Sequence, residues 1–144
     1  MIVIESKDSI EKVNWQQVRK LLIMCGLNDR NVEQLEKAFR NSAFCWFGYK
    51  DEQLIAVARA ISDYTWCNYL CDVAVVPEQQ GLGYGKILMN VITNQLQPFG
   101  KTFIYAIEDK IPFYRQFGFS ILTTGMIFAD SSELLKMHEQ GYIR

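Results

Sequence analysis

Apolar residues recur at helical spacing in four parts of the chain. In the first part, Asn14 is suited to cap a helix and Gly26 to end it, and Asn31 or Asp29 would cap the second. Pro112 fits the first position of the last helix, where its missing N–H leaves no bond unmade. This spacing predicts helices over residues 15–25, 32–41, 86–96 and 112–118.

Short runs of β-branched and aromatic residues predict the strands. They cover residues 2–5, 44–49, 54–61, 67–76, 102–107, 119–122 and 126–129, the last two as a closing pair. Together with the helices, this order predicts an α/β protein of the α+β type, with a mixed, largely antiparallel central sheet flanked by helices. No linker or internal repeat interrupts the chain, so residues 1–144 are expected to form a single domain.

The stretch from Val73 to Met89 carries the clearest chemical signal. The apolar run Val73–Val76 predicts a buried strand, and Pro77 ends it. Glycines follow at the alternate positions 81, 83 and 85, and an amphipathic helix begins after them. A glycine turn before a helix presents free N–H groups and the positive end of the helix dipole. The stretch therefore predicts an anion site, with a pyrophosphate group as the expected ligand.

Two common phosphate-binding loops fit this stretch poorly. In a dinucleotide-binding turn the third glycine would come one position later, and an acidic residue would stand at Gln97–Phe99. A nucleoside-triphosphate loop needs a hydroxyl after its lysine, whereas an isoleucine follows Lys86. The pattern Gln80-x-x-Gly83-x-Gly85 instead resembles the coenzyme A pyrophosphate loop of the GCN5-related N-acetyltransferases (GNAT).

A second motif supports this resemblance. Phe113-Tyr114-Arg115-Gln116-Phe117-Gly118-Phe119 is similar to the Tyr-x-x-x-Gly-Phe ending of the fourth helix in the same family. The element order is also that of the family, so the resemblance covers essentially the whole chain and implies the acyl-CoA N-acyltransferase fold. More narrowly, residues 57–63, Asp72-Val73 and Phe113-Tyr114 are similar to the subgroup that includes plant and cyanobacterial arylalkylamine (serotonin-type) acetyltransferases.

The resemblance implies roles for residues of this chain. Tyr114 would be the general acid that protonates the coenzyme A thiolate, unless its ring only packs against its aromatic neighbours. Asp72, or else Glu108, would be the general base, although both could equally be solvated charges at strand ends. The residues expected to bind acetyl-CoA are Val73, Ala74, Val75, Gln80, Gly81, Leu82, Gly83, Tyr84, Gly85 and Lys86.

The acceptor side is less specific in the sequence. The residues expected near the amine are Trp46, Arg59, Tyr64, Trp66 and Tyr69. Aromatic residues at these places are also common in cores, and Arg59 could equally form a surface ion pair.

Composition narrows the class of partner and of chemistry. The net charge of −1 argues against nucleic-acid binding, and no apolar run approaches the roughly 20 residues of a membrane span. Residues 1–5 lack the form of a signal peptide, so a cytoplasmic location is expected. Because the four cysteines form no Cys-x-x-Cys pair and the single histidine, His138, lies in a polar segment, no metal site is expected.

These features predict an N-acetyltransferase that moves the acetyl group of acetyl-CoA to a primary amine by direct attack in a ternary complex. A small-molecule amine is the preferred acceptor, because nothing in the sequence indicates a groove for an elongated peptide. A protein or peptide acceptor stays open, and so does a non-catalytic acyl-CoA-binding regulatory module of the same fold. Many proteins of this fold pair through sheet edges or their last strands, so the resemblance also allows a homodimer.

Overall fold

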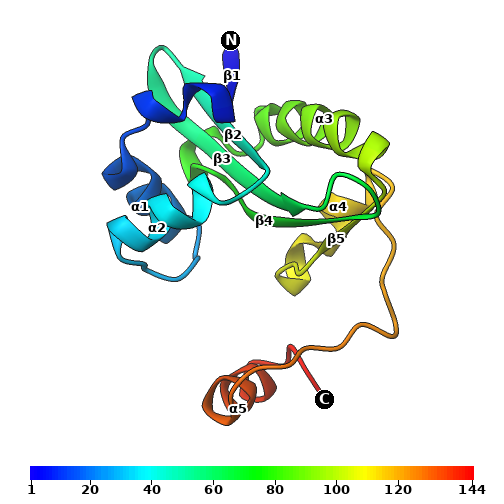
Figure 1. The fold of residues 1–144 in the computed structure, drawn as a ribbon. Helices are drawn as coiled ribbons and strands as arrows, with labels where there is room; N and C mark the ends of the chain where they lie inside the picture. Colours follow the sequence, from blue (N-terminus) through cyan, green and yellow to red (C-terminus); the bar gives the residue numbers. More distant parts are fainter.

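A five-stranded sheet forms the centre of the computed structural model, which describes residues 1–144 (Figure 1). The strands lie side by side in chain order, and β1 to β4 pair antiparallel while β5 runs parallel to β4. This arrangement confirms the predicted mixed, largely antiparallel sheet. The strands are β1 Ile2–Ser6, β2 Phe44–Lys50, β3 Gln53–Ser62, β4 Cys67–Val75 and β5 Lys101–Ile104.

Helices α1 and α2 lie on one face of the sheet and α3 lies on the other (Figure 1). The side chains of Asn14 and Asn31 cap α1 and α2 by accepting hydrogen bonds from backbone N–H groups, as their types predict. None of the helices combines the length and the apolar character needed to cross a membrane. The helices are α1 Trp15–Met24, α2 Val32–Arg40, α3 Tyr84–Leu96, α4 Ile111–Arg115 and α5 Ser131–Glu139.

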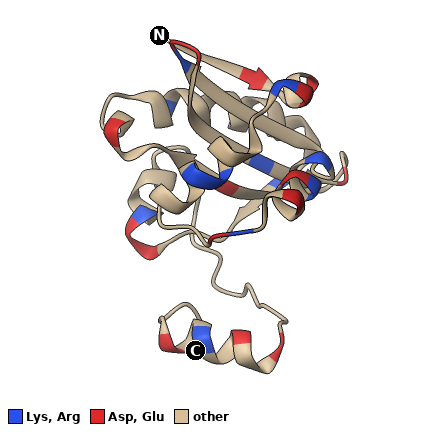
Figure 2. Ribbon diagram, turned by 90° about the vertical axis from the view of Figure 1, so that its left-hand side faces the viewer, with Lys and Arg blue, Asp and Glu red and all other residues tan.

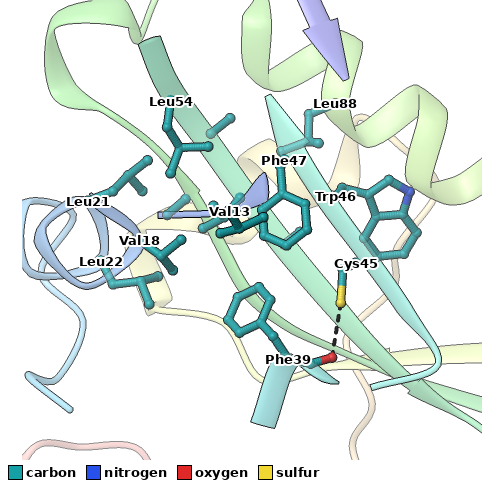
Figure 3. Packing of buried hydrophobic residues seen from close by; sticks show 14 of the residues in the cluster. Val13, Val18, Leu21, Leu22, Phe39, Cys45, Trp46, Phe47, Leu54 and Leu88 are labelled. Atoms are coloured by element: carbon teal, nitrogen blue, oxygen red, sulfur yellow. Dashed lines mark hydrogen bonds between the residues drawn. The ribbon is translucent and has the colours of Figure 1, made fainter. Parts of the chain in front are cut away.

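The interior strand β2 shows how one sheet supports two helical layers. Its alternate side chains point to opposite faces, as strand geometry requires. Phe47 stacks on Phe39 of α2 with ring centroids 5.8 Å apart, and Cys45 donates a hydrogen bond to the Phe39 carbonyl at 3.1 Å (Figure 3). Between them, Trp46 points the other way and donates to Gln95 Oε1 of α3 at 2.9 Å. Phe39, Trp46 and Phe47 are completely buried, which places the core on both faces of β2.

The sheet departs from regular pairing along β4. The register between β3 and β4 shifts between Val57 and Arg59, and Asp72 on the β4 side has a positive φ of 57°. Such a bulge bends the strand that carries it. β5 pairs with β4 only as far as Leu70 and ends at Ile104, not at the predicted residue 107. The second half of β4 therefore has no neighbouring strand on that side.

The chain after α4 differs from the prediction. Residues 119–122 and 126–129 form no strands, and the chain instead leaves the body as an extended connection to α5 (Figure 1). These residues have strand-like composition, but a strand is stable only beside a partner, and no strand of this chain pairs with them. The helix α5 was read from the sequence only as a polar segment. It is capped by Asp130, whose side chain accepts a hydrogen bond from the Glu133 N–H at 2.9 Å.

Candidate active site

A cavity of about 550 Å³ lies where β4 and β5 separate. Its walls are the second half of β4, the turn before α3, the chain that follows β5, and α4. Most of the residues predicted to bind acetyl-CoA meet here, although they come from a strand, a turn and a helix. Those that line the cavity are Val73, Ala74, Val75, Gln80, Gly81, Gly83, Gly85 and Lys86.

The other two predicted cofactor residues do not line the cavity. The side chain of Leu82 is 59% exposed. The ring of Tyr84 lies under the Lys50 ammonium group, 5.3 Å from its centroid, and packs against the core cluster. Only their backbone could contribute to a loop that wraps an anion.

The N-terminus of α3 has the properties of an anion site. Gly83 precedes the helix with φ of 86°, a conformation that favours glycine, and no side chain caps the helix. The Ile87 N–H donates to the Gly83 carbonyl at 3.1 Å, and the N–H groups of residues 84–86 have no protein acceptor. Lys86 and Lys110 also line the cavity, so free donors, the helix dipole and two cations favour negative charge there.

The third glycine of the turn has a packing role. A Cβ atom at Gly85 would lie 3.3 Å from Cζ of Phe113 and 3.9 Å from Cγ2 of Val75. Glycine therefore lets the first turn of α3 approach α4 closely, whereas Val75 of β4 lies at an ordinary contact distance, and this packing forms one wall of the cavity.

The gap beside β4 leaves backbone groups available to a ligand. The Val75 carbonyl accepts hydrogen bonds from Gln80 Nε2 at 2.7 Å and from Cys25 Sγ at 3.1 Å, and from no strand on that side. Because the Val76 N–H donates to Ile55 of β3, alternation along β4 turns the N–H groups of Val73 and Val75 toward the gap. The N–H of Ala74 faces β3, so Ala74 differs from its two neighbours in what it can offer a ligand.

Tyr114 lies in the cavity wall and is also part of an aromatic cluster. Its ring centroid is 5.2 Å from that of Phe113 and 5.8 Å from that of Phe119. Its hydroxyl has no hydrogen-bond partner within the protein, and burial raises the pKa of Tyr114 to about 12. The phenol is therefore neutral near pH 7 and free to donate a hydrogen bond into the cavity.

Asp72 also lines the cavity, but its carboxylate is held by two arginines. Arg30 donates to it at 2.8 and 3.1 Å and Arg59 Nε donates at 2.7 Å, while the Asp72 side chain is only 8% exposed. Burial would raise the pKa of Asp72, but the hydrogen bonds and charges of the two arginines outweigh it and leave the pKa lowered. A carboxylate held in this way accepts a proton poorly near pH 7, which favours a structural role over that of a base.

The other candidate base, Glu108, is exposed at the start of a 3-10 turn and does not line the cavity. The role of Arg30 as a partner of Asp72 could not be predicted from the sequence. Arg30 lies 42 residues before Asp72 in the loop between α1 and α2, and no motif links the two.

The residues predicted for the acceptor side do not form a slot. Trp46 is completely buried in the core, because its strand faces helices on both sides. Tyr64 packs on other aromatic rings, Trp66 is 78% exposed, and Tyr69 lies on the sheet surface. Arg59 forms the ion pair that the sequence left open, although this pair is largely buried. None of these five residues lines the cavity.

Several residues that line the cavity were missed at the sequence level. Cys25 and Leu27 enter from the end of α1, and Tyr105, Ile107 and Lys110 enter from the chain after β5. No motif marks them, because they are brought together only by the way the two segments pack. Burial raises the pKa of the Cys25 thiol, which keeps it protonated near pH 7.

Comparison with known proteins identifies the family. The sequence profile of the acetyltransferase (GNAT) family matches residues 14–119. The chain belongs to this family. It is 29% identical over 126 residues to the uncharacterized N-acetyltransferase ycf52 of Pyropia yezoensis, which covers 81% of this chain and 72% of that protein. It is 30% identical over 113 residues to GCN5-related N-acetyltransferase 1, chloroplastic, of Arabidopsis thaliana, covering 76% of this chain and 57% of the relative.

Solved structures agree with this GNAT assignment. A GNAT-family structure from Xanthomonas campestris pv. campestris is 26% identical with a TM-score of 0.77, covering 90% of this chain and 94% of the other. An acetyltransferase from Clostridium acetobutylicum, solved with acetyl-CoA, shares the fold with a TM-score of 0.70 at 18% identity, covering 96% and 99%. The predicted fold and the predicted class of enzyme, an acetyltransferase, are thereby confirmed. The narrower likeness to arylalkylamine enzymes stays a prediction.

Proposed function

We propose that this GNAT enzyme transfers the acetyl group of acetyl-CoA to the primary amine of a small molecule, by direct attack in a ternary complex. The observation that carries the proposal is the separation of β4 from β5. It brings the glycine turn, the unpaired backbone of β4 and Tyr114 to a single cavity. The reaction needs an anion site, donors for the thioester oxygen and a donor for the leaving sulfur, and each need has a candidate group there.

The cavity fits the chemistry of coenzyme A. The free N–H groups at the start of α3, with Lys86 and Lys110, would hold the phosphates of the cofactor. Bound acetyl-CoA would supply the activated acetyl group. The N–H groups of Val73 and Val75 would then stabilise the negative charge that develops on the thioester oxygen. Each well-placed donor of this kind lowers a barrier by about 3 kcal/mol.

Tyr114 would donate a hydrogen bond to the leaving sulfur. In water a phenol is a weaker acid than a thiol, whose pKa is about 8.5, so the proton would not pass to an exposed thiolate. Within the cavity the same burial that raises the pKa of Tyr114 would also raise that of a thiolate beside it. Burial therefore keeps the phenol neutral and also increases the affinity of the developing thiolate for a proton, so Tyr114 can stabilise and then protonate the sulfur.

The amine would lose its proton to water, not to Asp72. The structure gives Asp72 two guanidinium partners, and no other carboxylate lines the cavity. If water is the acceptor, kcat/KM rises with pH up to the pKa of each amine, and the inflection shifts when a less basic amine is used. An inflection at one constant pH for both amines would point to a base on the enzyme.

Direct attack is proposed because the cavity lacks an activated nucleophile. Its one thiol, Cys25, has a raised pKa and no histidine beside it. Initial rates measured over both substrates should give intersecting lines, and Cys25→Ser should keep its activity. Parallel lines together with an acetylated protein detected by mass spectrometry would instead indicate a covalent intermediate.

Calorimetric titration with acetyl-CoA is the primary test, with NAD and ATP as controls that also carry phosphates. We expect a Kd near the micromolar range for acetyl-CoA, which corresponds to about −8 kcal/mol, and no measurable binding of the controls. Equal binding of all three would show a general anion site. Absence of acetyl-CoA binding would overturn the proposal.

Transfer of the acetyl group to an amine of a protein is the second candidate function, and one comparison favours it. A protein named as a histone acetyltransferase, TAP1 of Glycine max, is 35% identical over 74 residues, half of this chain and 32% of that protein. Thiol release from acetyl-CoA should be compared for arylalkylamines, aliphatic amines and lysine-containing peptides. Transfer to peptides alone would replace the small-molecule acceptor with a protein.

We propose the cytoplasm as the location of the protein. Two Arabidopsis relatives carry chloroplastic in their names, so a plastid is the alternative compartment. Fractionation of the source cells, followed by detection of the native protein with an antibody, would separate the two.

A further inference from the structure

Three charged side chains form a cluster at the border of the cavity, which we call the guanidinium cluster: Arg30, Arg59 and Asp72. Both arginines donate to Asp72, and Asp72 itself lines the cavity. The side chains of Arg30 and Arg59 are 31% and 15% exposed. Neither arginine forms an ion pair with any other carboxylate. The cluster therefore holds two positive charges against one negative charge, which leaves a positive surplus beside the cavity.

The side chains next to the cluster do not supply the missing negative charge. Cys71 pairs with Arg59 across the sheet, and Tyr69 lies on the same face of β4. Burial raises the pKa of both Cys71 and Tyr69, so both groups are neutral near pH 7. Ser42 accepts a hydrogen bond from Arg59 Nη1 at 3.3 Å but carries no charge. Because an uncompensated charge that is largely removed from water is costly, a bound anion would stabilise the cluster.

Both guanidinium groups keep donors that the protein does not use. A guanidinium group carries five N–H groups in a planar fork, and each of these two arginines donates from two of its nitrogens. Arg30 Nε is buried and donates to no group of the protein. Arg59 Nη2 has no protein partner either. Donors in such places call for an acceptor, and the planar carboxylate matches the fork of an arginine.

The attraction for an anion at this place is local. Lys and Arg residues are interspersed with Asp and Glu residues over the body in Figure 2, and the chain as a whole carries a net charge of −1. The phosphates of acetyl-CoA have their own donors at the start of α3, together with Lys86 and Lys110. The surplus charge of the guanidinium cluster is therefore left for a second anionic group.

The cluster lies next to the place where the acetyl group would react. Asp72 directly precedes Val73, whose N–H faces the gap beside β4 and would hold the thioester oxygen. Neighbouring residues of a strand are only about 3.3 Å apart along it. An amine that attacks the thioester and an acid group bound at the cluster would thus be a few bonds apart in one molecule. Amino acids have this arrangement.

We propose that the acceptor of this enzyme carries a carboxylate close to its amine, as an amino acid does, and that Arg30 and Arg59 bind this carboxylate. The inference rests on the proposed transfer to a small-molecule amine and adds the class of acceptor. The carboxylate takes the unused donors and balances the surplus charge, while the amine points to the thioester. Arg30 is the better residue to test, because its replacement leaves Asp72 the hydrogen bond from Arg59.

Acceptor pairs that differ only in the carboxylate test the proposal. The probes are tryptophan with tryptamine, leucine with 3-methylbutylamine and lysine with cadaverine, and the readout is thiol release from acetyl-CoA. In the pair that the wild type uses best, kcat/KM should be at least about 10-fold higher for the acid, since charged hydrogen bonds contribute at least this much. An equal or higher kcat/KM for the simple amine in every pair that reacts would overturn this inference alone. No transfer to any probe would overturn the proposed function with it.

Arg30→Gln tests the residue itself. It removes the charge and the fork and keeps a polar side chain. We expect the preference for the acid over its simple amine to fall at least about 10-fold, mainly through a higher KM for the acid. The preference is a ratio measured within one variant, so it does not depend on the fraction of the variant that is folded. If Arg30 only supported Asp72, both acceptors would lose rate alike and the preference would stay, which would contradict the inference.

Arg19→Gln is the matched control. Arg19 also holds an aspartate with two hydrogen bonds, donating to Asp29 at 2.6 and 2.8 Å, but it does not belong to the cluster or the cavity wall. This variant should keep the preference for the acid, and an equal loss in both variants would overturn the inference. Calorimetry with acetyl-CoA should give Arg30→Gln the Kd of the wild type. A weaker Kd would assign the cluster to a phosphate of the cofactor instead of the acceptor.

Discussion

Tyr114 shows how one residue can serve packing and chemistry together. Its ring contacts two phenylalanines, so a purely structural role explains its burial, yet its hydroxyl lacks any partner within the protein. Tyr114 is half-buried, and a polar group in such a place without a protein partner usually has a reason to be there. The cavity beside it supplies that reason.

Tyr114→Phe keeps the ring contacts and removes only the hydroxyl. We expect kcat to fall about 100-fold and the acetyl-CoA Kd to stay unchanged, because general acids contribute to the transition state. Steady-state kinetics and calorimetry measure the two effects. Tyr105→Phe, at another tyrosine of the cavity wall, is the matched control and should keep its kcat. Since the pKa of Tyr114 is raised to about 12, its acid form persists below that pH. The wild type and Tyr114→Phe should therefore share one pH profile of kcat up to about pH 10.

Asp72→Asn tests the ion pairs at the bulge. Asparagine tolerates the positive φ as aspartate does, but it leaves the charges of Arg30 and Arg59 without compensation. We expect a loss of about 3 kcal/mol in the free energy of unfolding, measured with urea. If the Asp72→Asn variant were as stable as the wild type and inactive with every amine, Asp72 would be the base after all.

The same ion pairs predict a dependence of stability on acid. The folded-state pKa of Asp72 is lowered, so its contribution is complete above the unfolded value of about 3.9 and is lost as the pH falls through the folded value. Urea denaturation at a series of pH values below about 5 should show that the free energy of unfolding falls more steeply with decreasing pH for the wild type than for Asp72→Asn. Parallel curves would mean that the arginines do not hold the carboxylate in solution.

At the level of elements, the site depends on the turn that starts α3. Gly83→Ala places a Cβ at φ of 86° and should cost about 1 kcal/mol in stability. It should also weaken acetyl-CoA binding about 10-fold, because the turn aims the free N–H groups of the helix. Gly118→Ala is the control: it has a φ of 90° and equally open surroundings, but lies outside the cavity wall. Equal losses of affinity in both variants would remove the special role of the turn.

The length of β5 also belongs to this scale, and it explains what the sequence could and could not predict. Residues 102–107 are mostly apolar, so their pattern predicts one long strand. The strand ends at Ile104 because the bulge at Asp72 turns β4 away, and no partner remains for the last residues. A strand end that is set by a neighbouring strand leaves no mark in its own sequence.

At the level of the whole molecule, Phe39 in the core and Phe128 in the chain between α4 and α5 are the two extremes of burial. Phe39 is completely buried, with ring centroids 5.4 Å from Trp15 and 5.8 Å from Phe47, and it joins α1, α2 and β2 (Figure 3). Phe39→Ala should lower the free energy of unfolding by about 4 kcal/mol. Phe128→Ala, measured on dilute protein, should change it by less than about 0.5 kcal/mol. A comparable loss at Phe128 would show that this side chain is buried within the single chain in solution.

The sequence by itself determined the helices with their caps, the central strands, the anion-binding turn and the family. Each of these rests on residues that are close together in the chain: a capping asparagine, an alternation of side chains or three spaced glycines. Only the tertiary structure decided what depends on distant partners. The pairing of Asp72 with Arg30 and Arg59 favours a structural role for this candidate base, and burial in the core keeps Trp46 out of the cavity. Residues 119–122 and 126–129 have strand-like composition but form no strand, because pairing needs a neighbour that local sequence cannot supply.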